Sequence, residues 1–175
     1  MAEVRVRAAL VAIVVVAAGL LPAAARASTH NFATAAFKTV DSKLGFTFDV
    51  PDFLQTGATS GSNRVVLGSP DDDFAVVVSD FGADQTDVAA RDAVYRAALL
   101  RAGLEVTTET DVTAAGRTLK RYVCKVDTSA GPGHAEAVLV SVSGRVYLLM
   151  VVTPATTVDA RKAAITRIFE SIRIA

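Results

Sequence analysis

Apolar positions along the chain alternate in some segments and run without interruption in others, and both patterns predict β-strands. Residues 45–50 alternate, with Phe46, Phe48 and Val50 on one side, as in a strand that buries one face. Residues 75–78 and 146–152 are apolar at every position, so we expect the strands that contain them to be covered on both faces. The predicted strands are residues 36–40, 45–50, 64–67, 74–79, 105–113, 117–127, 135–142 and 145–153.

A first helix is predicted between Asp84 and Gly103. Asp84 can accept hydrogen bonds from the free backbone N–H groups of the first turn, and Gly103 is placed to end the helix. The buried stripe of this helix is expected to consist of Ala90, Val94, Ala97 and Leu104. Two oppositely charged pairs, four residues apart, are expected on its solvent side: Asp87–Arg91 and Asp92–Arg96.

A second helix is predicted from Thr153 and Pro154 to the C-terminus, since proline suits a first helical turn. Its apolar residues follow at helical spacing: Val158, Ile165, Ile168, Phe169 and Ile172. Turn signals at residues 114–116 and 143–144 join long strands into hairpins, which makes the sheet antiparallel. The sequence therefore predicts an α+β fold, a three-layer α/β/α sandwich with a central, mainly antiparallel sheet of about six to eight strands.

The N-terminus has the pattern of a secretory signal peptide. Arg5 and Arg7 give a positive start, residues 8–21 form an apolar run, and small residues follow Pro22. A helix that spans a bilayer needs roughly 20 apolar residues, which is more than this run supplies. We therefore predict cleavage after Ala27 and export to the periplasm, the cell wall or the medium, with an uncleaved anchor as the alternative.

Loss of residues 1–27 from a chain of 175 leaves 148 residues, enough for one domain with its own core. Residues 28–35 are predicted to form a loose mature N-terminus, and residues 36–175 a single domain. The whole chain has 18 basic and 18 acidic residues, and the leader holds three of the arginines and one glutamate. The mature chain thus has 15 basic and 17 acidic residues and a net charge of −2. Without a basic block it lacks the electrostatic attraction that dominates nucleic-acid binding.

Three consecutive aspartates, Asp71 to Asp73, are the first candidate for chemistry. Neighbouring residues in an extended chain point to opposite sides, so Asp71 and Asp73 could face one ion but Asp72 could not. In the calcium-loop pattern counted from Asp71, Val76 stands where Gly is required and Gly82 where Glu is required. We therefore predict no metal ligand here. We interpret the run as a turn whose charges protect the apolar strand that follows from aggregation. An ion held by Asp71 and Asp73 is the alternative.

His134 and Cys124 are the other candidates. His134 heads a predicted strand, with Asp127 and Ser129 across the same loop, and these are the residue types of a hydrolase triad. No G-x-S-x-G motif accompanies them, so we interpret His134 as a solvated loop residue and predict no catalytic residue. Cys124 lies on the expected buried side of its strand, where a thiol is inert.

Four short segments each combine a few turn residues with a few core residues, and their order along the chain is typical of a known family. They are GFTFDVP at residues 45–51, GRTL at 116–119, GRVY at 144–147 and IFESIR at 168–173. In these segments the chain resembles the PsbP-like superfamily, which includes the extrinsic photosystem II subunit PsbP, its bacterial relatives and secreted bacterial domains of unknown function. The resemblance covers residues 36–173. It implies an antiparallel sheet between helices and a non-catalytic accessory or adaptor role, with no catalytic residue to carry over.

The function expected from the sequence is that of a secreted, non-catalytic accessory or binding domain of the bacterial cell envelope. It would act through protein–protein contacts with an envelope or secreted partner. One alternative is a carrier of a small or apolar ligand, held between sheet and helix or in the loop at residues 55–63. A second alternative is a hydrolase built around His134. No cofactor, no metal, no nucleic acid and no membrane span after cleavage are predicted.

Overall fold

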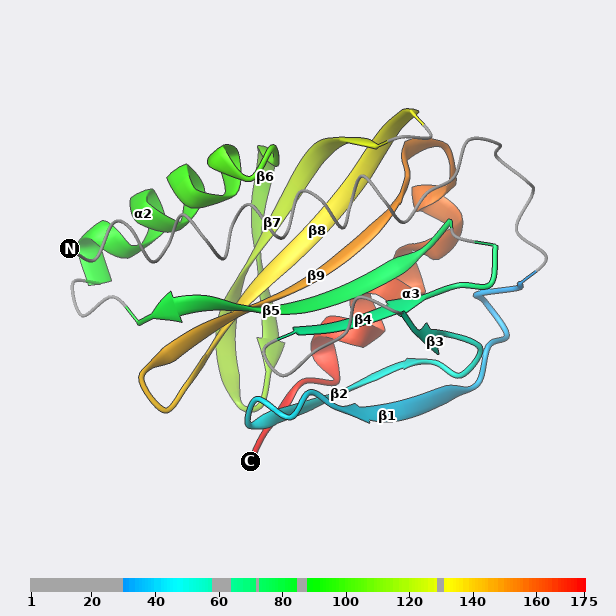
Figure 1. Ribbon diagram of the computed structural model, residues 1–175, viewed down its shortest axis with the longest axis horizontal. Helices are drawn as coiled ribbons and strands as arrows, with labels where there is room; N and C mark the ends of the chain where they lie inside the picture. The colour runs from blue at the N-terminus through cyan, green and yellow to red at the C-terminus, as the bar shows by residue number, and fades with distance from the viewer. Residues whose placement is uncertain (1–29, 58–63, 72, 85–87, 129–130) are drawn as a thin grey trace.

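The computed structural model describes residues 30–57, 64–71, 73–84, 88–128 and 131–175, and the side chains of all of these except residues 88–90. A seven-stranded sheet forms the centre of the molecule (Figure 1). Its strands, in spatial order, are β3 (Gln55–Thr56), β4 (Arg64–Gly68), β5 (Ala75–Ala83), β9 (Arg145–Pro154), β8 (Gly131–Val142), β7 (Arg117–Thr128) and β6 (Glu105–Ala114). Every neighbouring pair is antiparallel, which confirms the predicted sheet.

A second, three-stranded sheet was not predicted. It consists of β1 (Phe37–Asp41), β2 (Phe46–Pro51) and β10 (Arg173–Ile174), with β2 in the middle. The sequence correctly predicted that β2 buries alternate residues, but not which sheet it joins. Its buried side chains pack against a helix and one face of the large sheet, so β2 contributes to a layer instead of extending the central sheet.

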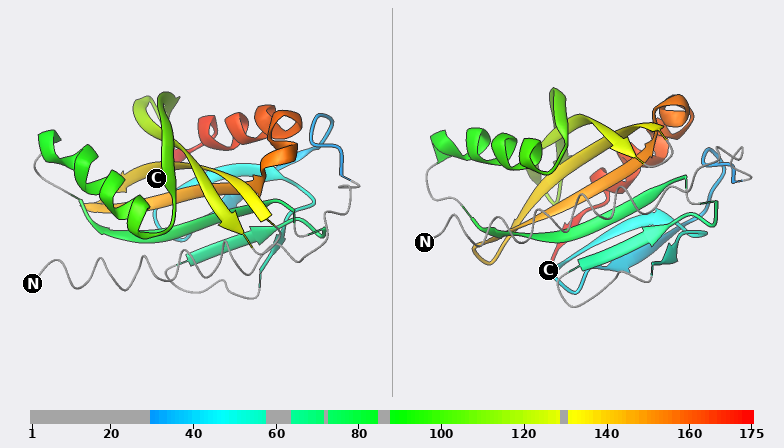
Figure 2. Two further views of the ribbon diagram at one scale, coloured as in Figure 1. Left: turned by 90° about the horizontal axis from the view of Figure 1, so that it is seen from above. Right: turned by 45° about the horizontal axis from the view of Figure 1, so that its top comes forward.

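Within the described ranges the fold has two α-helices, α2 (Val88–Arg101) and α3 (Val158–Glu170), and the short 3-10 turn η1 (Ala155–Thr157) precedes α3. The helices lie toward opposite ends of the long axis, and the three-stranded sheet lies beside α3 (Figure 2). Among the described residues, neither helix has the length and apolar composition needed to cross a membrane.

The central sheet has a hydrophobic core on each face, as its doubly apolar strands predicted. Alternate residues of β5 face opposite ways, so Val77 joins the core under α2 while Val76 and Val78 join the core under α3. The second core also contains Phe46 and Phe48 of β2, which lie beneath α3. The arrangement is therefore helix on sheet on a mixed layer of helix and sheet, consistent with the expected sandwich.

The predicted stripe of α2 is partly wrong. The buried residues of the described part are Tyr95, Ala98 and Leu99, together with Ala102 and Leu104 after the helix. Val94 is 40% exposed, because the helix turns Tyr95 toward the sheet, where its ring meets Phe81 edge-on. The ring centroids are 5.8 Å apart, and an aromatic pair of this kind decides which face of a weakly amphipathic helix is buried.

The expected charged pair Asp92–Arg96 is not observed, because both residues have partners on the sheet. Arg96 bonds the carboxylate of Glu109 on β6, and Lys120 on β7 lies 4.0 Å from the carboxylate of Asp92. Charged side chains of the adjoining sheet thus replace the helix residues as ion-pair partners. Asp87 and the other residues between Asp84 and Val88, where the first turn of the helix was predicted to begin, lie outside the described residues.

The N-terminal residues that were expected to be loose are tied to the core from His30 onward. Phe32 is 7% exposed and lies 4.8 Å from the ring of Phe74 and 5.1 Å from that of Phe53, measured between centroids. His30 stacks on Phe53 and its Nδ1 lies 3.2 Å from a carboxylate oxygen of Asp71. One buried aromatic ring is enough to anchor a short segment that has no secondary structure of its own.

Gly45 has no room for a side chain. Its φ is +91°, and a Cβ there would lie 2.8 Å from Cγ1 of Val142. We expect Gly45→Ala to lower the free energy of unfolding by about 1–3 kcal/mol, measured by urea denaturation. Gly68→Ala is the matched control, because its Cβ meets nothing within 4 Å and it is a strand glycine without positive φ. Equal losses in the two variants would contradict the prediction.

Candidate functional site

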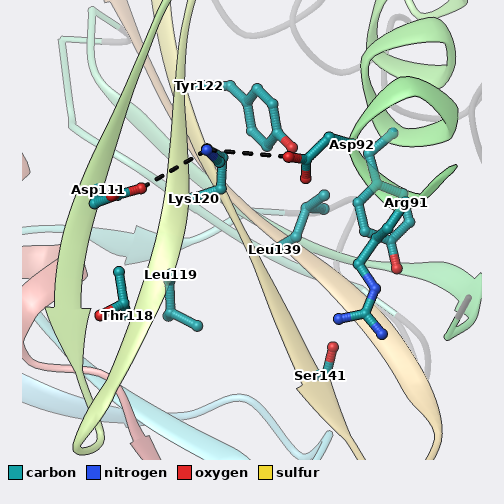
Figure 3. Close-up of a pocket in the computed structure, with 10 residues that line it drawn as sticks. Arg91, Asp92, Asp111, Thr118, Leu119, Lys120, Tyr122, Leu139 and Ser141 are labelled. Atoms are coloured by element: carbon teal, nitrogen blue, oxygen red, sulfur yellow. Dashed lines mark ion pairs between the residues drawn. The ribbon is translucent and has the colours of Figure 1, made fainter. Parts of the chain in front are cut away.

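A cavity of about 330 Å³ lies between α2 and the β6–β8 part of the large sheet (Figure 3). Its principal lining residues are Arg91 and Asp92 from α2, Asp111 from β6, Lys120 and Tyr122 from β7, and Ser141 from β8. None of these was a candidate in the sequence, because the lining is drawn from four separate segments. The carrier hypothesis did, however, predict a pocket between sheet and helix, and this cavity is in that place.

The β6–β7 hairpin sets the floor of the cavity. The register pairs Lys120 with Asp111, so their side chains project to the same face, and Tyr122 follows two residues later on that face. Nζ of Lys120 lies 3.9 Å from Oδ1 of Asp111 and 4.0 Å from Oδ2 of Asp92 (Figure 3). These groups are partly exposed, so each ion pair contributes about 0–1 kcal/mol to stability. Their main effect is to hold charge of both signs at one opening.

The hydroxyl of Tyr122 is a buried polar group that lines the cavity. The residue is 0% exposed, and its hydroxyl oxygen has no hydrogen-bond partner among the described residues. Burial raises the pKa of Tyr122, and the carboxylates of Asp92 and Glu109 raise it further, so the phenol is neutral and able to donate. A buried hydroxyl without a partner costs about 1–3 kcal/mol. The sequence predicted the apolar environment of Tyr122, but not the missing hydrogen-bond partner of its hydroxyl.

The rim on α2 is fixed by the carboxylate of Asp84. Its Oδ1 accepts a hydrogen bond of 3.0 Å from the hydroxyl of Tyr95 and lies 3.5 Å from Nη2 of Arg91. The backbone N–H of Asp84 bonds the carbonyl of Gly144 at 2.9 Å, which anchors the entry to α2 on the β8–β9 turn. Two of the three α2 side chains that line the cavity, Arg91 and Tyr95, are therefore positioned before any ligand arrives.

The three aspartates do not form the simple solvated turn that the sequence predicted. Asp71 contacts His30, Asp72 lies outside the described residues, and Asp73 is buried. The carboxylate of Asp73 accepts a hydrogen bond of 2.9 Å from Ser69 and forms an ion pair with Arg161. The prediction that solvated charge covers the strand is wrong for Asp73, because a cation from α3 reaches it across 88 residues of sequence.

Arg161 belongs to the buried face of α3, where the sequence pattern indicated only apolar side chains. It is 2% exposed, bonds Asp73 and the hydroxyl of Thr153, and its Cζ lies 4.8 Å from the ring centroid of Phe32. A buried guanidinium requires such partners, since an unpaired buried charge is costly. Within the described residues, no group of three or more His, Cys, Asp or Glu is placed to hold a metal ion.

His134 lies within β8 and not in a solvated loop, as its partners across the sheet show. It pairs with Lys125 on one side and Thr153 on the other. Its Nε2 is 2.8 Å from a carboxylate oxygen of Glu136, which is 4% exposed and also paired with Arg121. In the part of the chain that the structure describes, the side-chain partner of His134 is thus a carboxylate and not a hydroxyl or thiol nucleophile. Ser129 lies outside that part.

Two of these groups have shifted pKa values. Burial raises the pKa of Glu136, but the hydrogen bond from His134 and the charge and hydrogen bonds of Arg121 outweigh it and keep the pKa below its ordinary value. Burial raises the pKa of the Cys124 thiol to about 12, and the carboxylate of Glu136 acts in the same direction. Cys124 is 1% exposed, which confirms its predicted place in the core and makes its thiolate form scarce at neutral pH.

Comparison with known proteins gives matches in structure and not in sequence. No protein-family model matches the chain, and no curated protein matches it significantly. The PsbP protein CyanoP of Synechocystis superposes with a TM-score of 0.60 at 16% identity, covering 85% of this chain and 98% of that one. The chain has the PsbP-like fold. The fold implied by the resemblance noted in its sequence is thereby confirmed.

Other structures that share the PsbP-like fold come from distant organisms. LpqN of Mycobacterium tuberculosis, described as involved in cell envelope biogenesis, matches with a TM-score of 0.52 at 14% identity, over 81% of this chain and 92% of its own. The Ran-binding protein Mog1p of Saccharomyces cerevisiae matches with a TM-score of 0.54 at 11% identity, over 81% and 96%. At such identities the similarity establishes the fold alone.

Proposed function

We propose that the protein is an exported, non-catalytic binding domain of a bacterial cell envelope, acting through contacts with another protein. The PsbP-like fold is the observation that carries this proposal. Two other proteins share the fold. One is described as a Ran-binding protein, and the other as involved in cell envelope biogenesis. The signal-peptide pattern at residues 1–27 supports export.

The carrier function is a second candidate because of the cavity between α2 and the sheet. Its 330 Å³ fall at the lower end of the range of about 300–1,000 Å³ that is typical of small-molecule sites. A ligand there would lie beside α2 and leave the α3 side of the molecule free. The two candidates are therefore compatible in one protein.

Export and partner binding can be tested in one experiment. The full chain with a C-terminal tag is expressed in its native host, the cells are crosslinked intact, and captured proteins are identified by mass spectrometry. The matched control is residues 28–175 with the same tag, which lacks the leader and stays inside the cell. We expect a mature protein that begins at Ser28 and one dominant envelope partner that the control does not capture.

Two results would contradict the proposal. If the protein keeps residues 1–27 and remains in the cytosolic fraction, the proposal that it is exported is wrong. A correctly processed protein that captures no partner above the control would remove the protein-contact role and leave the carrier function.

A further inference from the structure

The cavity between α2 and the β6–β8 part of the sheet contains a buried polar group without a partner. Tyr122 is fully buried, lines the cavity, and its hydroxyl forms no hydrogen bond within the described structure. In Figure 3 the hydroxyl end of its ring points toward Asp92 at the opening and not into the sheet. Buried hydroxyls are normally satisfied, so one that faces a cavity indicates a group that arrives from outside.

The charges around that hydroxyl are balanced. Arg91 and Lys120 supply two cations, and Asp92 and Asp111 supply two carboxylates, all of them lining the same cavity. A site for a phosphate or carboxylate ligand would have an excess of cations, and a site for an amine would have an excess of carboxylates. A balanced set offers donors and acceptors together without selecting for charge. Hydroxyl groups of a neutral ligand use both, because each one donates and accepts.

The remaining walls suit the carbon face of such a ligand. Leu139 and the ring of Tyr95 line the cavity beside the polar groups, and Thr118 and Ser141 add small hydroxyls. Tyr95 is held by its hydrogen bond to Asp84, so its ring is fixed before binding. Aromatic and aliphatic walls with a few fixed polar groups are typical of small-molecule sites.

From these observations we infer that the cavity binds a saccharide, a neutral polyhydroxylated ring, with the Tyr122 hydroxyl donating to one of its oxygens. Lys120 donates to a second oxygen and Asp92 accepts from a neighbouring hydroxyl. The inference names a ligand class for the binding domain proposed above and rests on that binding role. It needs neither export nor a protein partner, so a failure in purified protein is distinguishable from a failure of the envelope experiment.

The test uses isotope-labelled protein of residues 28–175 and a panel of soluble sugars. Neutral probes are glucose, galactose, arabinose, N-acetylglucosamine and trehalose, and charged comparators are glucuronate and glucosamine. Amide resonances are followed during titration, and the dissociation constant is read from the shifts. We expect at least one neutral sugar to shift amides of residues 118–122 and 139–141, more strongly than its charged comparator.

Tyr122→Phe separates a ligand group from a structural one. The variant removes one oxygen that has no partner, so stability should be unchanged or slightly raised, whereas sugar affinity should fall about tenfold. Ser79→Ala is the matched control, because it removes another buried hydroxyl without a partner, from β5 and outside the lining of the cavity. Its sugar affinity should equal that of the unchanged protein.

Three outcomes would overturn the inference. They are no shift with any neutral sugar, shifts confined to residues away from the cavity, and equal sugar affinity in Tyr122→Phe and the unchanged protein. Stronger binding of glucuronate or glucosamine than of the neutral sugars would also overturn it, since the site would then select for charge.

Discussion

Replacing Arg161 with Met is expected to lower the free energy of unfolding by about 3–5 kcal/mol. The guanidinium is 2% exposed and neutralises the buried carboxylate of Asp73. It also bonds the hydroxyl of Thr153 and lies against the ring of Phe32. Methionine fills similar space but leaves the carboxylate buried without a cation. Urea denaturation at pH 7 measures the loss.

The double variant Arg161→Met with Asp73→Leu is the control for this prediction. Removing both charges also removes the uncompensated carboxylate, so the double variant should recover a large part of the stability lost by Arg161→Met. The two changes should be strongly non-additive, because the groups are in direct contact. A loss below about 1 kcal/mol in the single variant would show that water solvates this pair, contrary to the prediction.

Replacing Arg121 with Met is expected to cost about 2–4 kcal/mol at pH 7, and the cost should depend on pH. In the native protein the pKa of Glu136 is held below its ordinary value of 4.5, so this group stabilises the fold above about pH 4.5. That contribution is lost as the pH falls through the folded-state pKa. Without Arg121 the burial of Glu136 favours protonation, and its pKa should rise above the unfolded value.

The difference in stability between the native protein and Arg121→Met should therefore be largest near neutral pH. It should shrink as the pH falls through the raised pKa of Glu136 in the variant and then through its lowered pKa in the native protein. Urea denaturation at a series of pH values measures this difference. Glu136→Gln in the Arg121→Met background is the matched control, since the amide keeps the volume but has no charge to titrate. A stability difference that stays constant with pH, or persists unchanged in the control background, would contradict the role assigned to Glu136.

These two ion pairs explain why the protein can bury charged groups in a core that the sequence indicated to be apolar. Arg161 joins α3 to the residues before β5, 88 residues away, whereas Arg121 joins the consecutive strands β7 and β8. Arg121 also lies 5.4 Å from the ring of Phe169, measured from Cζ to the centroid, so it contacts α3 as well. We expect both pairs to matter for the cohesion of the layer that contains α3.

The sequence by itself indicated the longer strands, the presence of the two helices and the antiparallel pairing of the large sheet. It predicted neither β3 nor β10, and the second helix ends at Glu170 and not at the C-terminus. The features that it indicated depend on local periodicity and on turns such as Ser143-Gly144, where φ is +50° and +76°. The run at residues 75–78 correctly indicated a strand buried on both faces. Such properties repeat every two to four residues, so a short window of sequence contains all the information they need.

Only the tertiary structure decided the second sheet, the buried ion pairs and the cavity. The place of β2 depends on its packing against α3 and one face of the large sheet. The ion-pair partner of Asp73 is 88 residues away in the chain. Tyr122 was recognisable as a core residue, but its unsatisfied hydroxyl becomes visible only when β7 is packed against α2. Hydrogen-bond satisfaction and cavity volume are properties of several segments together, and no local pattern in one segment encodes them.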